Sequence, residues 1–410
     1  MGAEVSLGSR GALRPCPVCG ALRVEVLHRQ YFVTPSECAL PDMYDVVSCE
    51  QCGMVYADTT ACQGDYDAFY RDLSRYDTPG LSTGGGDTPL DRARLAQTAE
   101  FLASSLPDRS APLLDVGCGN GGLLIALAEL GFDNLEGMDP SPKCARNVRA
   151  AGFRAMVGTL SSSGGEVAGL AGRFRYVVLS HVLEHLCDLK SAFASVVSLV
   201  EPGGLIWVEV PDASRYVEHD VVPFYYFDVE HINHFDEESL RGLAAMSGLD
   251  VVATIKKTIA VSKDRLYPAV GALMSVPAIA RTPSVLRSAG GARLSVMEYV
   301  RHSRENDRWD CLEQLQASGA GSVAVWGAGS LAQRLMATSA LGRCDVVAFV
   351  DNDPSKQGTC LAGRPVHAPN WLKGFGGTIV VAAALAADAI MRDIEELGLP
   401  NPIVVASKRR

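Results

Sequence analysis

The strongest constraint on the fold lies in residues 113–122, which read LLDVGCGNGG. A short apolar run leads into closely spaced glycines, and this pattern predicts a buried strand, a tight turn and a helix. Glycines let the backbone approach a ligand, and the first turn of the following helix presents unpaired N–H groups. The segment therefore predicts an α/β domain with a site for a nucleotide-like ligand. A strand-to-helix turn without a ligand is the alternative.

The spacing of the turn, D-x-G-x-G-x-G, differs from the G-x-G-x-x-G of dinucleotide-binding folds. Asp115 stands two residues before Gly117, and Gly119 follows. This frame resembles the first motif of class I S-adenosylmethionine (SAM) methyltransferases, in which the turn holds the amino-acid part of the cofactor. The resemblance implies that SAM is the cofactor and that Asp115, Gly117 and Gly119 bind it.

Further strand–turn–helix units follow this turn. Residues 131–140 predict a second strand that ends in Asp139, where an acid can accept hydrogen bonds from a ribose diol. Residues 153–157 predict a third strand, and residues 176–180 form an apolar run typical of a strand buried on both faces. The alternation predicts a doubly wound α/β sheet of the class I SAM methyltransferase type over residues 90–237, with Asp139 as a further cofactor-binding acid.

Four cysteines near the N-terminus have the spacing of metal ligands. Cys16 and Cys19 form one C-x-x-C-G knuckle, and Cys49 and Cys52 form another, with a predicted strand between them. Two knuckles bring four thiolates together, which suits a tetrahedral Zn²⁺ site and leaves no open position for catalysis. We therefore expect a small structural zinc-binding module over residues 1–80. A redox role of the C-x-x-C pairs is the alternative.

The composition narrows the kinds of partner. The net charge is −10 and no basic stripe is visible, which argues against a nucleic-acid partner. The sequence shows neither the roughly 18 apolar residues that cross a bilayer nor the apolar segment of a signal peptide. Twelve cysteines suit a reducing compartment better than a disulfide scaffold in a chain of this size. We expect a cytoplasmic protein with a small-molecule substrate and no membrane partner, in an oligomeric state that the sequence leaves open.

A second strand–glycine–helix turn occurs at residues 322–331, which read SVAVWGAGSL, and residues 346–351 predict a strand ending in an acid. Taken alone, this pattern is compatible with a second nucleotide cofactor, although a purely structural turn is the alternative. Residues from 238 to about 318 have a mainly helical pattern. We therefore expect a helical segment and a C-terminal Rossmann-like α/β domain over residues 238–410.

The order of these parts is similar to the sugar C-methyltransferase family, which acts on nucleotide-linked deoxysugars in antibiotic biosynthesis. That family combines a four-cysteine zinc module, a central SAM methyltransferase domain and a C-terminal Rossmann-like domain. The resemblance implies methyl transfer from SAM to a carbon of a 4-keto deoxysugar on a nucleoside diphosphate, with the C-terminal domain helping to enclose the nucleotide-sugar. Methylation of oxygen or nitrogen in a small natural product, and a non-catalytic zinc-stabilised nucleotide-binding module, are the alternatives.

Two histidine-containing segments supply the candidate catalytic residues. Residues 181–185 (HVLEH) follow the apolar strand, and Glu230 and His231 occupy the place of an adjacent Glu-His pair in the C-methyltransferases. A carbon can attack the methyl sulfonium only as an enolate, so a base that titrates near neutral pH is needed. The resemblance implies that His231 removes the proton, with Glu230 and His185 assisting.

Other interpretations of these segments remain open. The letters H-x-x-E-H of residues 181–185 also match an inverted zinc-protease motif, but here they end a strand instead of lying within a catalytic helix. Packing at a domain junction is the alternative for His231 and the favoured interpretation for His234. The C-methyltransferases usually have a tyrosine where this chain has Asp228. The resemblance therefore supports the predicted architecture more strongly than the predicted substrate.

Tyrosines lie between the predicted zinc module and the glycine turn. In the C-methyltransferases a tyrosine from this segment covers the cofactor, and Tyr76 is the equivalent that the resemblance implies. Tyr66 and Tyr70 are four residues apart, which is typical of packing on one face of a helix. Residues 82–87 (STGGGD) predict a flexible joint.

Overall fold

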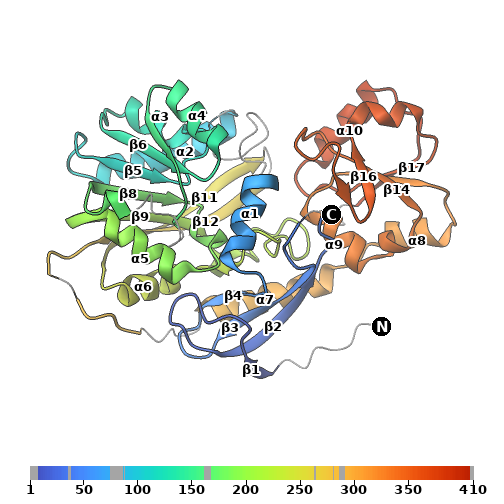
Figure 1. The fold of residues 1–410 in the computed structure, drawn as a ribbon. Helices are drawn as coiled ribbons and strands as arrows, with labels where there is room; N and C mark the ends of the chain where they lie inside the picture. The colour runs from blue at the N-terminus through green and yellow to red at the C-terminus, as the bar shows by residue number, and fades with distance from the viewer. Residues whose placement is uncertain are drawn as a thin grey trace.

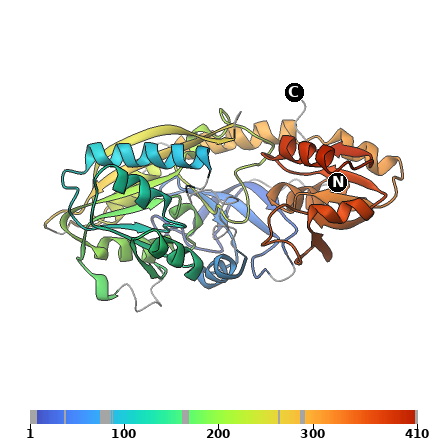
Figure 2. The same ribbon diagram turned by 90° about the horizontal axis from the view of Figure 1, so that it is seen from above.

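The described strands form three sheets (Figure 1). The computed structural model describes residues 8–35, 38–73, 86, 88–160, 168–262, 265–279, 281–285 and 291–406. Seen from above, the N-terminal sheet lies between the central part and the C-terminal part of the molecule (Figure 2). Among the described helices, none combines the length and the apolar character that crossing a bilayer requires.

The N-terminal sheet is antiparallel, with its strands in the order β1-β2-β3-β4-β10. The predicted strand between the two cysteine knuckles is confirmed as β3. The last strand, β10, is distant in sequence from the other four, and its pairing with β4 joins this sheet to the central part of the molecule. The strands are β1 (Ser9–Gly11), β2 (Arg23–Tyr31), β3 (Met43–Cys49), β4 (Val55–Asp58) and β10 (Asn233–His234).

The central sheet has the strand order β11-β12-β9-β8-β5-β6-β7, and the predicted doubly wound arrangement is confirmed. Its parallel strands are β5 (Leu113–Val116), β6 (Leu135–Asp139), β7 (Arg154–Val157), β8 (Phe174–Ser180) and β9 (Val200–Pro211). Helices lie on both faces of the sheet (Figure 1). They are α2 (Pro89–Ser105), α3 (Gly122–Glu129) and α4 (Pro142–Ala150) on one face, and α5 (Leu189–Leu199) and α6 (Glu237–Met246) on the other.

The expected helical segment from residue 238 onward is wrong for its middle part. Two long antiparallel strands, β11 (Asp250–Ser262) and β12 (Arg265–Ser275), extend the central sheet beyond β9. Both strands are rich in β-branched and other apolar residues, which pack well on a pleated surface. Pairing with each other and with β9 holds them as strands, although their apolar spacing is compatible with a helical period. The central sheet therefore runs past the boundary that we expected at residue 237.

The C-terminal sheet has the order β15-β16-β14-β13-β17-β18, and the central pairings of β13 with β14 and β17 are parallel. This confirms the second Rossmann-like α/β fold. The strands are β13 (Val323–Trp326), β14 (Val346–Val350), β15 (Cys360–Leu361), β16 (Arg364–His367), β17 (Thr378–Val381) and β18 (Ile403–Val405). The helices of this part are α8 (Asp310–Ala317), α9 (Ser330–Thr338) and α10 (Ala387–Glu396).

An aromatic core joins the N-terminal sheet to the central part and to α7 (Gly291–Asn306). The rings of Tyr216 and Tyr226 stack at 3.8 Å between centroids, and the hydroxyl of Tyr299 accepts a hydrogen bond from the N–H of Tyr226 at 3.3 Å. His234 is fully buried in this core, with its Nδ1 3.2 Å from the hydroxyl of Tyr216. The favoured interpretation of His234 as a packed junction residue agrees with this position.

The burial of His234 predicts a loss of stability in mild acid. Burial, and then the neighbouring His231, lower the pKa of His234 to about 3, whereas an unfolded histidine titrates near 6.5. The unfolded chain therefore takes up this proton first, and the stabilising effect of a neutral His234 is lost as the pH falls below about 6.5. Between pH 6.5 and pH 5 the expected loss is about 2 kcal/mol.

Urea denaturation at pH 7 and pH 5 tests this expectation when wild type and His234→Gln are compared. Between pH 7 and pH 5 the free energy of unfolding should fall by about 2 kcal/mol less in the variant than in the wild type, whatever the stability of the variant at pH 7. Equal pH dependence in the two proteins would contradict the prediction.

Candidate active site

The glycine turn lies at the carboxyl edge of the central sheet, directly after β5. Gly117 and Gly119 have φ angles of 72° and 51°, in the left-handed region that favours glycine. A Cβ atom at Gly117 would lie 2.6 Å from a methyl carbon of Val182, so a larger residue does not fit. Gly121 caps the N-terminus of α3. The turn therefore keeps its backbone close to the chain that leaves β8.

Asp115 and Asp139 lie beside this turn. Oδ2 of Asp139 accepts a hydrogen bond from the N–H of Gly119 at 2.9 Å, and Oδ1 accepts one from the N–H of Ser141 at 2.8 Å. Asp115 is buried. Burial, and then the nearby Asp139, raise the pKa of Asp115 to about 8. A negative charge on Asp115 in addition to that on Asp139 is therefore unfavourable unless a cation binds beside them.

The structure brings together the four described residues that the sequence predicts for cofactor binding: Asp115, Gly117, Gly119 and Asp139. Tyr76 and most of the predicted joint at residues 82–87 lie outside the described residues.

The two histidine segments meet just beyond the end of β8. A short 3₁₀ helix, η2 (Leu183–His185), is joined to the chain around β10 by several hydrogen bonds. The N–H of Ile232 donates to the carbonyl oxygen of Glu184 at 2.9 Å, and the side-chain amide of Asn233 donates to the carbonyl oxygens of Leu183 and Leu186, each at 2.8 Å. As a result, the rings of His185 and His231 lie 4.9 Å apart between centroids.

His185 has two polar neighbours at its Nδ1 atom. The hydroxyl of Tyr70, on α1 (Gln63–Leu73), lies 2.8 Å away, and the carbonyl oxygen of Glu230 lies 3.1 Å away. The carbonyl can only accept, whereas the hydroxyl can donate or accept, so both contacts are satisfied together by the neutral tautomer that carries its proton on Nδ1. Burial is the main cause that lowers the pKa of His185, which favours the neutral ring. Glu230 thus contacts His185 through its main-chain carbonyl.

Asp228 orients His231. Oδ2 of Asp228 lies 3.3 Å from Nδ1 of His231, and Oδ1 accepts hydrogen bonds from the N–H groups of Glu230 and His231 at 2.9 and 2.7 Å. A carboxylate at Nδ1 selects the tautomer in which Nε2 carries the lone pair. The residue that departs from the C-methyltransferase pattern therefore has a role that sequence reasoning missed.

The H-x-x-E-H segment does not form the helix of a zinc protease. It forms the short η2 helix, and His181 faces the carboxylates of Glu184 and Glu209 at 3.1 and 3.4 Å. The ligand-type atoms of Glu184, His185 and His231 lie within 4.8 Å of one another. The site therefore combines two imidazoles with a carboxylate whose side chain is fully buried.

The four predicted metal ligands cluster at one end of the N-terminal sheet. The sulfur atoms of Cys16 and Cys52 lie 3.6 Å apart, those of Cys19 and Cys49 lie 3.5 Å apart, and all four lie within 4.8 Å of one another. Zn–S bonds of about 2.3 Å in a tetrahedron separate two sulfur atoms by about 3.8 Å. The observed arrangement fits such an ion.

The glycine turn of the C-terminal domain is held by an ion pair. Oδ2 of Asp351 accepts hydrogen bonds from the N–H of Ala328 at 2.8 Å and from Nζ of Lys356 at 3.0 Å. A Cβ atom at Gly329 would lie 3.9 Å from the same Nζ atom. A lysine therefore lies at the mouth of the turn, where a nucleotide cofactor would approach.

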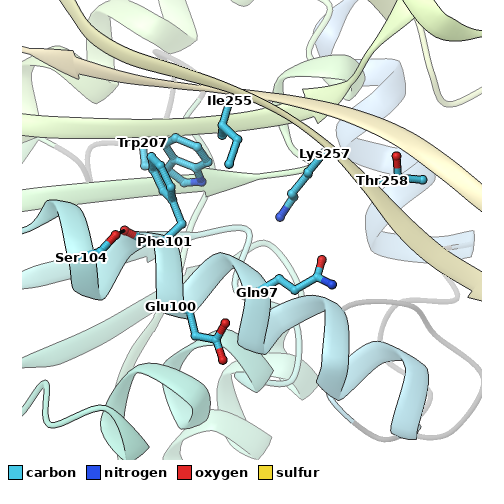
Figure 3. Close-up of a pocket in the computed structure, with 8 residues that line it drawn as sticks. All are labelled: Gln97, Glu100, Phe101, Ser104, Trp207, Ile255, Lys257 and Thr258. Carbon is cyan, nitrogen blue, oxygen red and sulfur yellow. Dashed lines mark hydrogen bonds between the residues drawn. The ribbon is translucent and has the colours of Figure 1, made fainter.

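A pocket of about 500 Å³ lies between α2 and the long strands of the central sheet (Figure 3). The rings of Phe101 and Trp207 form one wall, with 4.5 Å between centroids. Sequence reasoning missed this pocket because its residues come from distant parts of the chain, and none of the sequence-predicted site residues lines it. The lining residues are Gln97, Glu100, Phe101, Ser104, Trp207, Ile255, Lys257 and Thr258.

Two known families match the central and C-terminal parts of the chain. Residues 90–254 match a family described as a methyltransferase domain, and residues 320–405 match a family described as C2185-like, N-terminal. The methyltransferase match contains the glycine turn, both acids beside it and both histidine segments.

Similar proteins share only part of their length with this chain. A ubiquinone biosynthesis O-methyltransferase from Cereibacter sphaeroides is 34% identical over 116 residues, which cover 26% of this chain and 45% of the relative. The C-methyltransferase NovU from Streptomyces niveus is 26% identical over 245 residues, or 58% of each chain. The chain thus spans less than two thirds of both relatives.

One of the solved structures that match this chain is the Burkholderia thailandensis 1,6-didemethyltoxoflavin-N1-methyltransferase, with bound 1,6-didemethyltoxoflavin and S-adenosylhomocysteine. It is 19% identical, with a TM-score of 0.39, and the match covers 55% of this chain and 95% of that structure.

Proposed function

We propose that this chain, through its methyltransferase domain at residues 90–254, transfers a methyl group from SAM to a carbon atom next to a ketone. The observation that carries the proposal is the cluster of His185, His231 and Tyr70, joined to the glycine turn through Val182. A carbon nucleophile needs a base to remove a proton and a hydrogen-bond donor for the oxygen that becomes negative. This cluster contains groups for both tasks.

The acceptor that we propose is a 4-keto deoxysugar linked to a nucleoside diphosphate, used in natural product biosynthesis. The sequence resemblance to sugar C-methyltransferases supports this choice, as does the similarity to the C-methyltransferase NovU over 245 residues. In this proposal the C-terminal domain helps to enclose the nucleotide part of the substrate.

In this proposal the residues at the glycine turn bind SAM. The open backbone at Gly117 and Gly119 receives the amino-acid part, and Asp139 accepts hydrogen bonds from the ribose hydroxyls. Asp115 balances the positive charge of the cofactor. Tyr76, outside the described residues, covers it. When bound, SAM supplies an activated methyl sulfonium group, and holding the acceptor beside it supplies much of the acceleration.

The catalytic residues of the proposal are His231, Glu230 and His185. Nε2 of His231 removes the proton while Asp228 stabilises the charge that forms on the ring. With its proton on Nδ1, the neutral ring of His185 donates to the carbonyl oxygen of Glu230 and to the hydroxyl oxygen of Tyr70, and the Tyr70 hydroxyl donates its own proton to the enolate oxygen. Glu230 assists through its carbonyl contact with His185.

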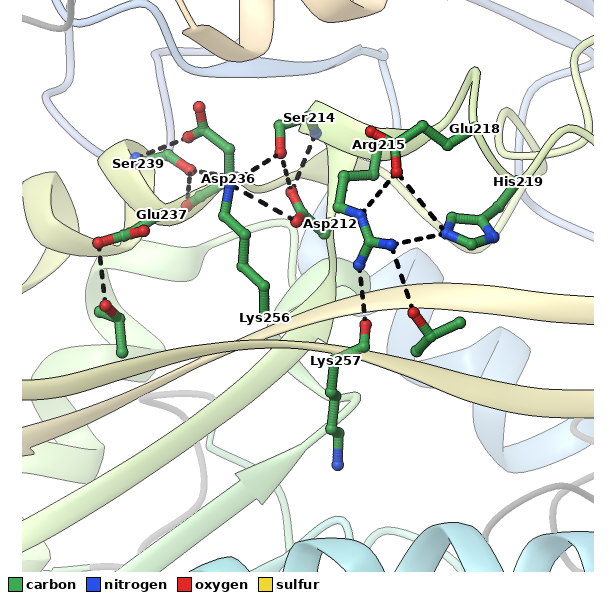
Figure 4. A network of polar contacts seen from close by, with 12 residues as sticks. Asp212, Ser214, Arg215, Glu218, His219, Asp236, Glu237, Ser239, Lys256 and Lys257 are labelled. Atoms are coloured by element: carbon green, nitrogen blue, oxygen red, sulfur yellow. Dashed lines mark hydrogen bonds and ion pairs between the residues drawn. The ribbon is translucent and has the colours of Figure 1, made fainter.

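Hydrogen exchange tests this role of His231. A nucleoside-diphosphate-linked 4-keto deoxyhexose in D₂O should exchange its proton beside the ketone when the enzyme is present, as measured by NMR. In His231→Gln the exchange rate should fall by about 100-fold or more, while the affinity for SAM stays within twofold. His219→Gln is the matched control, because the ring of His219 contacts Arg215 and Glu218 (Figure 4). An unchanged rate in His231→Gln would remove it from the role of base.

Methylation of oxygen or nitrogen is the second candidate function. The 34% identity to an O-methyltransferase favours it, and His231 would then deprotonate a hydroxyl or amine. SAM binding without exchange at carbon would favour this function. Absence of SAM binding would leave a zinc-stabilised nucleotide-binding module without catalysis.

The raised pKa of Asp115 predicts that SAM binding releases a proton. The carboxyl group is protonated below about pH 8 in the free protein, and the cationic cofactor favours its ionised form. The affinity for SAM should therefore rise by up to about tenfold per pH unit from pH 6 to pH 7.5. Calorimetry in two buffers of different ionisation enthalpy measures the released proton.

Asp115→Asn should bind SAM about tenfold or more weakly and release no proton. The exposed Asp133→Asn is the matched control and should behave as wild type. Proton release that persists in Asp115→Asn would refute this assignment.

The four-cysteine cluster is proposed to hold a structural Zn²⁺ ion, with Cys16, Cys19, Cys49 and Cys52 as ligands. Purified protein should contain about one zinc per chain, and Cys16→Ser should lower the thermal midpoint by about 10 °C or more. The exposed Cys62→Ser is the control and should keep both the metal and the midpoint. Metal-free protein with reversible disulfides among these cysteines would instead support the redox alternative.

A further inference from the structure

A row of ionisable side chains leads from the histidine pair into the interior of the central sheet. Nζ of Lys257 lies 2.6 Å from Oε2 of Glu209, and Oε1 of Glu209 lies 3.4 Å from Nε2 of His181. Nδ1 of His181 lies 3.1 Å from Oε1 of Glu184. Both glutamate side chains are fully buried. Groups that can be positive and groups that can be negative therefore alternate along the row.

His181 is held firmly in the middle of this row. Its φ angle is 57°, a left-handed conformation that is uncommon for a residue other than glycine. Its N–H donates to the carbonyl oxygen of Glu209 at 2.7 Å. Burial opposes a charge on the ring, but the contacts with Glu184 and Glu209 outweigh burial and raise the pKa of His181. This environment favours the imidazolium form.

The far end of the row is fixed by α2 and β11. The hydroxyl of Thr98 donates to Oε2 of Glu209 at 3.2 Å and accepts from Nζ of Lys257 at 2.7 Å. Lys257 points from β11 toward α2 (Figure 3). Burial opposes ionisation of Glu209, but His181 and Lys257 hold its pKa at about 2. Glu209 therefore stays ionised at neutral pH.

The near end of the row is Glu184, beside the histidine pair. Its Oε2 atom is buried and has no hydrogen-bond partner in the described part of the chain, while one oxygen of the carboxylate lies within 4.8 Å of one ring nitrogen of His185 and of one ring nitrogen of His231. An unsatisfied buried carboxylate oxygen is costly. A positive charge on a neighbouring imidazole would stabilise this buried carboxylate by electrostatic attraction.

We propose that Glu184 stabilises the imidazolium that forms on His231 during proton removal, and that Lys257, Glu209 and His181 hold Glu184 in place. This inference rests on the proposed function. The proton of the acceptor C–H bond moves to His231, and the electron pair of that bond moves into the enolate. His231 thereby gains a positive charge beside Glu184. The four residues act through His231 and are positioning residues.

Other ionisable groups face this row from neighbouring elements. Tyr216 and Tyr267 interact with Glu184, and Arg94 of α2 interacts with His181 and Lys257. The two tyrosines have pKa values raised well above 10 by burial, so they stay neutral. The carboxylate of Asp228 also faces His231, at 3.3 Å from its Nδ1 atom. Although burial opposes ionisation of Glu184, the contact with His181 lowers its pKa, so the pH dependence near neutrality is assigned to the histidines.

The chain offers a closely matched pair of lysines for the test. Lys256, the neighbour of Lys257 on β11, points to the opposite side of the strand, where its Nζ atom lies 4.0 Å from Asp212 (Figure 4). Lys257→Met removes a charge from the row, and Lys256→Met removes the same charge from the other side. The exchange rate of Lys256→Met should equal that of wild type.

The decisive variant is Glu184→Gln, with the proton-exchange reaction as readout. Its kcat for exchange should fall by about tenfold or more at unchanged KM, and the acid-side loss of activity should shift to lower pH. Glu184→Asp should recover part of the rate, and Lys257→Met, which removes a positive charge from the row, should produce a smaller shift of the acid-side loss to higher pH. Wild-type kcat and pH profile in Glu184→Gln would overturn the inference. If Glu184→Gln does not fold, an unshifted profile in Lys257→Met would overturn it.

A readout without substrate separates this inference from the proposed function. In Glu184→Gln, the pKa of His181 followed by NMR should fall toward the ordinary value, because one of its two carboxylate partners is gone. If wild type exchanges no keto-sugar, the proposed function fails, and a falling pKa of His181 still supports the network. An unchanged pKa of His181 would overturn the network even in an enzyme that catalyses exchange.

Discussion

The close contact of Val182 with Gly117 is the packing constraint on which the site depends. Because a Cβ atom at Gly117 would lie 2.6 Å from Val182, the chain that leaves β8 can lie directly against the glycine turn. Residues 183–185 follow at once. The histidine cluster therefore lies next to the proposed cofactor site. Methyl transfer requires this arrangement, because the reacting groups must be held together.

The N-terminal module shapes the same site. Arg14 is buried, and its guanidinium donates to the carbonyl oxygens of Ala57, Cys187 and Ile232 and to the side-chain oxygen of Asn233. One side chain thus joins β4 to both histidine segments. A buried guanidinium without these acceptors would be costly, so the fold of the cysteine module and the position of His231 are coupled.

Sequence reasoning was most successful where the evidence is local. The strand before the glycine turn, the acids at the ends of β5 and β6 and the two cysteine knuckles follow from short patterns, because a turn or a knuckle depends on adjacent residues. It failed for β11 and β12, whose strand character depends on pairing with β9. It also missed Tyr70, whose contact with His185 joins residues 115 positions apart.

The sequence by itself determined the strand–turn–helix units around the two glycine turns, the strand between the cysteine knuckles and the chemistry of the candidate ligands, because backbone turns and ligand types are properties of short segments. Only the tertiary structure decided which ionisable groups meet. Asp228 behind His231, Tyr70 against His185 and the row from Lys257 to Glu184 arise from contacts between distant elements. The physical reason is burial: exclusion of water makes the energy of each charge depend on its neighbours in space, which the linear order of residues does not reveal.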